Sequence, residues 1–88
     1  MNVKKLESFL ATVEHGTVSA AAVQLGIGQP AVSKHLNALE AELGVELFDE
    51  ASRRTMLSPA GEKVLSTARV VVQAVNVLRA ELEAGRNS

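Results

Sequence analysis

The sequence contains no cysteine among its 88 residues, which excludes both a disulfide framework and a metal site built on thiolates. Its two histidines, His15 and His35, have no acidic cluster beside them, so we do not expect a structural zinc site. The sequence also lacks a recognisable nucleophile–base pair, metal cluster or phosphate-binding loop. It therefore predicts a protein that is not an enzyme and needs no cofactor.

Aromatic residues and long apolar runs are also scarce. Phe9 and Phe48 are the only aromatic residues, whereas proteins that bind single-stranded nucleic acid stack the bases on aromatic side chains. No run of apolar residues approaches the ~18 residues that a membrane span requires. These features argue against a single-strand binder and a membrane protein, and they predict a cytoplasmic protein.

Basic residues are not in excess, because the formal net charge is −1. One segment, 38–50, holds no basic residue and five acidic ones: Glu40, Glu42, Glu46, Asp49 and Glu50. The rest of the chain has 9 basic against 5 acidic residues, a net charge of +4. One surface of the protein can therefore be basic. Charge alone still favours the plainer interpretation, a solvated acidic helix face with scattered bases elsewhere.

Periodic apolar residues predict three helices in the first half of the chain. The first covers 3–14, the second is short with Ser19 as its N-cap, and the third begins at Gln29 and ends at Gly44. A turn containing glycine joins the second helix to the third. This arrangement is typical of a helix-turn-helix, at about 18–37.

The second half of the chain predicts a small hairpin followed by a long helix. Residues 45–48 and 55–57 have the pattern of short strands, which would form a two-stranded wing at about 45–57 resting on the helices. Ser58 and Pro59 mark the start of a helix over 59–84, and 85–88 form a polar tail. Apolar residues follow a heptad pattern along this helix: Val64, Ala68, Val71, Val75, Leu78 and Leu82. The pattern is typical of a helix that packs along another, as in a coiled coil.

Several short motifs occur in a fixed order along the chain. They are Ala20-Ala21-Ala22, Leu25-Gly26-Ile27, Gln29-Pro30-Ala31-Val32-Ser33-Lys34, Leu39-Glu40, Leu43-Gly44, Leu47-Phe48 and Leu57-Ser58-Pro59-Ala60-Gly61. In this order and spacing the sequence resembles the LysR-type transcriptional regulators over essentially all of its length. The resemblance implies a mainly α fold, with a winged helix-turn-helix (three helices plus a small two-stranded wing) over 1–58. The helix over 59–84 would be the linker helix that joins two chains.

The resemblance also implies a function. A homodimer, joined through the heptad residues of the last helix, would bind double-stranded DNA sequence-specifically at an imperfect palindromic operator and regulate transcription. Family members continue into an effector-binding domain that is absent from this chain, so a small-molecule effector and tetramer formation would belong to a longer protein. The alternative is a winged-helix module that binds proteins and has weak or no DNA binding. Gly28 and Glu50 favour it, because the family usually has serine or threonine and arginine at these positions.

The resemblance assigns DNA contacts to individual residues. Base-reading residues would lie at the start of the third helix, which faces the major groove in helix-turn-helix proteins: Gln29, Pro30, Ala31, Ser33, Lys34 and Asn37. Glutamine can bond adenine bidentately, lysine can donate to guanine or phosphate, and the apolar residues can contact thymine methyl groups. Candidates for phosphate or minor-groove contacts are Lys4, Lys5, Thr17, Ser19, His35, Arg53 and Arg54. Helix capping by Gln29, Ser33 and Ser19 and solvation of the basic residues are the competing interpretations.

Overall fold

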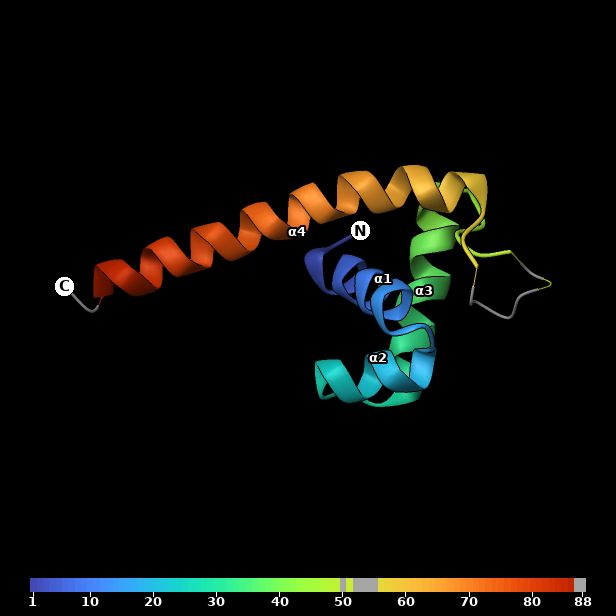
Figure 1. Ribbon diagram of the computed structural model, residues 1–88, viewed down its shortest axis with the longest axis horizontal. Coiled ribbons are helices and arrows are strands. Elements are labelled where there is room, and N and C mark those ends of the chain that lie inside the picture. Colours follow the sequence, from blue (N-terminus) through green and yellow to red (C-terminus); the bar gives the residue numbers. More distant parts are fainter. Residues whose placement is uncertain (50, 52–55, 87–88) are drawn as a thin grey trace.

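The computed structural model describes residues 1–49, 51 and 56–86. Within these ranges the chain forms four helices, α1 (Val3–His15), α2 (Val18–Leu25), α3 (Gln29–Leu43) and α4 (Pro59–Arg86). Figure 1 shows α1, α2 and α3 gathered into one cluster, while α4 passes over α1 and continues well beyond the cluster. This projecting helix makes the molecule elongated, with extents of 51 × 25 × 19 Å. The mainly α fold predicted from the sequence is confirmed.

The turn between α2 and α3 has the geometry that a helix-turn-helix requires. Gly26 ends α2 in the left-handed conformation, with φ at 68°, a region that glycine enters without the steric penalty of a side chain. The N–H of Ile27 donates to the carbonyl oxygen of Ala22 at 3.1 Å, so the chain turns sharply while its backbone stays hydrogen-bonded. The turn directs the start of α3 away from α2 and toward solvent.

The beginning of α2 differs from the sequence prediction. Thr17, not Ser19, is the N-cap: its backbone is extended, and its hydroxyl oxygen accepts the N–H of Ala20 at 3.0 Å. Ser19 lies inside α2, because the helix begins at Val18. Both residues can cap a helix. Gly16 is the C-cap of α1 and α2 begins at Val18, so Thr17 is the residue that occupies the N-cap position of α2.

The core lies where α1, α2 and α3 meet. Phe9, Leu36 and Leu39 are fully buried there, and the small side chains of Ala21 and Ala22 allow α2 to approach closely. Phe48 comes from the segment after α3, and its ring stands edge-on to that of Phe9, with ring centroids 5.6 Å apart. This aromatic pair fixes the segment after α3 against α1.

The predicted two-stranded wing is reduced, in the described residues, to one antiparallel bridge between Phe48 and Leu57. The N–H of Asp49 donates to the Met56 carbonyl at 2.7 Å, and the N–H of Ser58 donates to the Leu47 carbonyl at 3.0 Å. Leu47 and Phe48 are adjacent yet both buried, at 0% and 6% exposure. The side chains of a regular strand alternate between two faces, so two adjacent buried residues mark a departure from regular strand geometry at this point.

The start of α4 is held tightly to this bridge. Ser58 caps the helix as predicted, since its hydroxyl accepts the N–H of Gly61 at 2.9 Å. Gly61 is buried against the backbone of Leu47. The helix runs to Arg86, two residues beyond its predicted end. The direction of α4 is therefore set by the segment around Leu47.

Candidate nucleic-acid interface

The N-terminal half of α3 presents the predicted base-reading residues on one side. The side chains of Gln29, Pro30, Lys34 and Asn37 are exposed, and those of Ala31 and Ser33 are half-buried. The opposite side of α3 carries Val32, Leu36 and Leu39, which are fully buried against the core. Packing thus fixes the rotation of α3 about its axis and determines which side chains face outward. We call the six outward residues the α3 face.

Gly28 is the N-cap of α3 and makes no side-chain hydrogen bond to it. Its extended backbone, with φ at −73° and ψ at 150°, is open to other residues as well. Its carbonyl accepts the N–H of Ala31 at 3.0 Å, and Pro30 lies in the first turn, where a missing N–H costs little. The start of α3 is therefore held by backbone hydrogen bonds, without a capping hydroxyl from Gly28.

The two lysines of α1 lie in different surroundings. Lys4 is exposed and lines a cleft that also contains Ala31 and His35 at the start of α3. Lys5 forms an ion pair with Glu42, which lies 2.7 Å from the amino group of Met1 through its second oxygen. The hydrogen bonds from Lys5 and the amino terminus hold the pKa of Glu42 below its ordinary value. The charge of Lys5 is thus partnered near the C-terminal end of α3, about 20 Å along the helix from Gln29.

The other predicted phosphate contacts lie at the start of α2, on α3, or outside the described residues. Thr17 and Ser19 are exposed at the start of α2. His35 is half-buried on α3, with its Nδ1 atom 2.6 Å from the hydroxyl oxygen of Ser8 on α1. Arg53 and Arg54, together with Glu50, lie outside the described residues.

In the described ranges, no helix is long and apolar enough to cross a membrane. The same ranges contain no group of three or more acidic or histidine side chains that could hold a metal ion.

A model of bacterial regulatory helix-turn-helix proteins of the lysR family matches residues 3–62, from the start of α1 into the first turns of α4. The chain belongs to the LysR family. A probable hydrogen peroxide-inducible genes activator from Streptomyces viridosporus is 39% identical over 83 residues, which are 94% of this chain and 27% of that protein. The dual regulator OxyR of Escherichia coli (strain K12) is 37% identical over 90% of this chain and 26% of its own length. The chain thus spans about a quarter of these curated relatives.

Solved structures of other LysR proteins have the same fold. A complex of the BenM DNA-binding domain with benA site 1 DNA superposes with a TM-score of 0.85 at 30% identity, covering 96% of this chain and 98% of that chain. A complex of the CbnR DNA-binding domain with DNA gives a TM-score of 0.83 at 32% identity, covering 98% and 99% of the two chains. Both matches extend over nearly all of this LysR-family chain, α4 included.

The predicted heptad residues of α4 fall into two groups in this LysR-family chain. Ala68 is only 2% exposed and packs into the core of its own chain, so it leaves little surface for a partner. Val64 is half-buried against the same core, because α4 passes over α1 at this point (Figure 1). Val71, Leu78 and Leu82 are 39%, 55% and 57% exposed, and Val75 is half-buried. Only the later part of the predicted seam offers an exposed apolar surface.

Two further apolar residues of α4 were not predicted. Val70 and Val77 are 67% and 49% exposed, and they lie beside Leu78 around a shallow hollow on the projecting part of the helix. Val70 and Val77 are seven residues apart, so they occupy one heptad position, immediately before the position of Val71 and Leu78. We call the exposed apolar residues of the later helix the α4 seam: Val70, Val71, Val77, Leu78 and Leu82.

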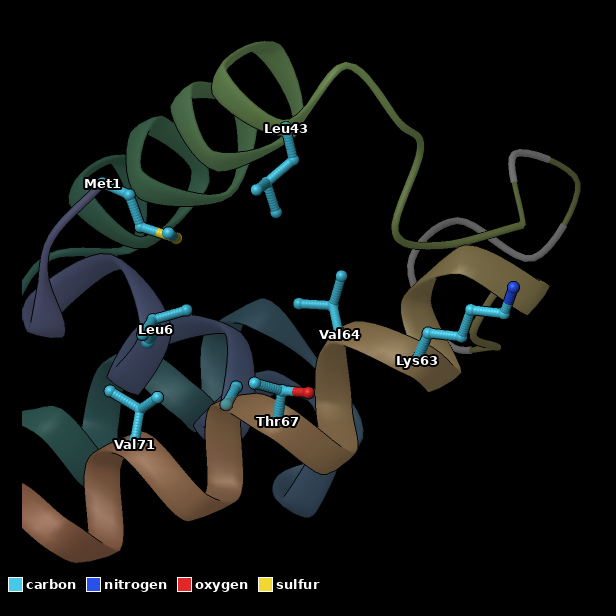
Figure 2. A pocket seen from close by; sticks show the side chains of 8 residues that line it. Met1, Leu6, Leu43, Lys63, Val64, Thr67 and Val71 are labelled. Atoms are coloured by element: carbon cyan, nitrogen blue, oxygen red, sulfur yellow. The ribbon is translucent and has the colours of Figure 1, made fainter.

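An apolar groove adjoins the α4 seam, between α4, Leu6 on α1 and Leu43 at the end of α3. Figure 2 shows the side chains of Leu6, Val64 and Val71 directed into this space, with Met1 and Leu43 on its far side. The groove has a volume of about 260 Å³, and its lining includes Ala68, Lys63 and Thr67 from α4. It extends the apolar surface of the α4 seam toward the helix cluster.

Proposed function

We propose that this chain is a sequence-specific reader of double-stranded DNA and forms the DNA-binding part of a transcription regulator. The observation that carries the proposal is the α3 face: polar and basic side chains are exposed on one side of a helix whose other side is locked into the core. A helix held in this way can enter the major groove in one orientation. The DNA complexes of the similar BenM and CbnR domains support the proposal.

The chemistry of the α3 face supports direct reading of bases. Gln29 can form two hydrogen bonds with adenine, and Lys34 can donate to guanine or to a phosphate. Pro30 and Ala31 can contact thymine methyl groups, while Ser33 and Asn37 supply further polar contacts. In this proposal Lys4, Thr17, Ser19 and His35 bind phosphates around the α3 face and fix its position on the duplex. Lys5 contributes only when it leaves Glu42, and Arg53 and Arg54 would contact the minor groove.

Binding through phosphates predicts a strong dependence on salt. If a dimer makes about four phosphate contacts, its affinity for a specific duplex should fall roughly a hundredfold as the salt concentration rises from 50 to 200 mM, because each contact releases condensed cations. Fluorescence anisotropy of a labelled duplex, repeated at several salt concentrations, measures the slope of affinity against salt. A flat response, or no binding at low salt, would instead favour the protein-interaction module.

The proposal includes a homodimer formed by the α4 seam of two chains. An apolar strip along a projecting helix is costly to expose to water, and a second copy of the same strip would cover it. Two copies would present two α3 faces to half-sites about one helical turn apart, which fits an imperfect palindrome. Tetramers and an effector-binding domain would belong to the longer regulator.

The double variant Leu78→Asp/Leu82→Asp should be a folded monomer with weak half-site binding. Both side chains are more than half exposed, so the charges disrupt the seam without entering the core of the chain. Sedimentation velocity measures the change in mass, and circular dichroism checks that the helices persist. The matched control is Asn76→Asp/Ala80→Asp, which adds the same charges at exposed positions with the same spacing on the side of α4 away from the seam. Dimers that persist in the Leu78/Leu82 variant would contradict the α4 seam.

A further inference from the structure

A part-buried hydrogen bond connects α1 directly to α3 beside the α3 face. The hydroxyl oxygen of Ser8, a fully buried residue of α1, lies 2.6 Å from Nδ1 of the half-buried His35 on α3. Both residues line an open cleft of about 400 Å³ together with Lys4, Glu7 and Ala31. The sequence pattern indicates no role for Ser8, because a single serine on the apolar side of a helix belongs to no motif.

The surroundings of Ser8 determine the direction of this hydrogen bond. A buried hydroxyl group that lacks an acceptor is costly, so such groups donate wherever an acceptor is in reach. Within the described residues, Nδ1 of His35 is the partner that the structure gives to the Ser8 hydroxyl. When this hydroxyl donates, Nδ1 accepts with its lone pair, and the neutral imidazole carries its proton on Nε2.

The orientation of the ring follows from the same contact. The two ring nitrogens are separated by one carbon of the imidazole, so Nε2–H is directed away from Ser8. His35 lines the same cleft as Ala31 and the exposed Lys4, and Lys34 is its neighbour along α3. Glu7 is the acidic group of this cleft. In this tautomer His35 presents an N–H donor at the edge of the α3 face.

We infer that Ser8 is a positioning residue for DNA binding: it fixes the ring orientation and the protonated nitrogen of His35, so that Nε2–H donates to a phosphate of the duplex. The inference rests on the proposed function. It extends that function by assigning a role to a buried residue that the DNA cannot touch. N–H groups that donate to phosphates hold a protein in register on the duplex. A donor whose orientation is already fixed in the free protein loses less conformational freedom when it binds.

The first test needs no DNA. In the ¹⁵N-labelled chain at pH 8, long-range ¹H–¹⁵N spectra should identify His35 as protonated on Nε2, with Nδ1 at a shift typical of a hydrogen-bond acceptor. In Ser8→Ala the Nδ1 signal should move toward that of a nitrogen without a hydrogen bond. Protonation on Nδ1 in the unchanged protein, or an Nδ1 signal that does not respond to Ser8→Ala, would overturn the inference.

The second test measures affinity for a specific duplex. Ser8→Ala should weaken binding about three- to tenfold, the range expected for one phosphate hydrogen bond made less well. His35→Ala removes the donor itself and should weaken binding at least as much as Ser8→Ala does. Adding Ser8→Ala to His35→Ala should then change little, because Ser8 acts through the imidazole. An equal loss in both backgrounds would mean a structural role and would overturn the inference.

The matched control is Thr12→Val, which removes another buried hydroxyl from α1 while keeping the size of the side chain. Thr12 is 1% exposed, and its hydroxyl donates to the Ser8 carbonyl at 2.8 Å within the same helix. The Thr12→Val variant should bind the duplex within about twofold of the unchanged protein, even if it is less stable.

If the unchanged protein binds no duplex, the proposed function fails together with the inference. If it binds and Ser8→Ala binds equally well, only the inference fails.

Discussion

Gly61→Ala is expected to lower the free energy of unfolding by about 3 kcal/mol or more. A Cβ atom at position 61 would lie 2.0 Å from the carbonyl oxygen of Leu47 and 2.9 Å from its carbonyl carbon. This backbone has little freedom to move aside. The Leu47 carbonyl accepts the N–H of Ser58 at 3.0 Å, and the Leu47 N–H donates to the Glu40 carboxylate at 2.9 Å. Relief of the clash therefore has to break hydrogen bonds or displace the first turn of α4.

The control for this prediction lies on the same helix. A Cβ atom added at Gly85 would meet no other atom within 4 Å. Gly85→Ala should therefore leave the free energy of unfolding unchanged or raise it by at most about 1 kcal/mol. Urea unfolding followed by circular dichroism measures both variants against the unchanged protein. A Gly61→Ala variant within about 1 kcal/mol of the unchanged protein would mean that α4 is not seated on Leu47 as described.

Lys34→Ala is expected to weaken binding to the specific duplex by about 1–3 kcal/mol, because this lysine is the basic side chain at the centre of the α3 face. Gln29→Ala should cost a similar amount and should also relax the preference for the base that Gln29 reads. Competition binding with duplexes changed at single positions separates the two effects. Loss of affinity without loss of preference would assign Lys34 to a phosphate.

Lys63→Ala is the matched control for Lys34→Ala, since it removes the same charge from another exposed site. Lys63 lies near the start of α4, beside the apolar groove and not on the α3 face. Its removal should change specific affinity by less than about twofold. Equal losses in the two variants would mean that the lysines act only through net charge, and the α3 face would then not be the reading surface.

Much of the helical framework could be predicted from the sequence, because local signals and packing agree there. The buried stripe of α3, with Leu36 and Leu39 at its centre, has helical spacing, and Ser58 caps α4 as its position before a proline indicates. The sequence alone does not determine which residue begins α2. Thr17 and Ser19 are both good caps, and only the folded turn after α1 selects the first of them.

Contacts between distant segments could not be predicted in the same way. A heptad pattern does not say which chain it packs against, and Ala68 is buried by the core of its own molecule instead of a partner. The hydrogen bond between Ser8 and His35 joins residues 27 positions apart, and neither residue belongs to a recognisable motif. In the described part of the predicted wing, Leu47 and Phe48 are both buried, which the alternating pattern of a strand does not predict. Each of these features depends on tertiary packing, which overrides local preference.

Selection from a library of random duplexes at moderate salt tests the central claim most directly, that the chain is a dimeric reader of double-stranded DNA. We expect an enriched motif with two-fold symmetry, whose half-sites are separated by about one helical turn. Enrichment should be lost with Lys34→Ala and should collapse to single half-sites with Leu78→Asp/Leu82→Asp. No enrichment by a chain that is folded and dimeric would contradict the claim and favour the protein-interaction module.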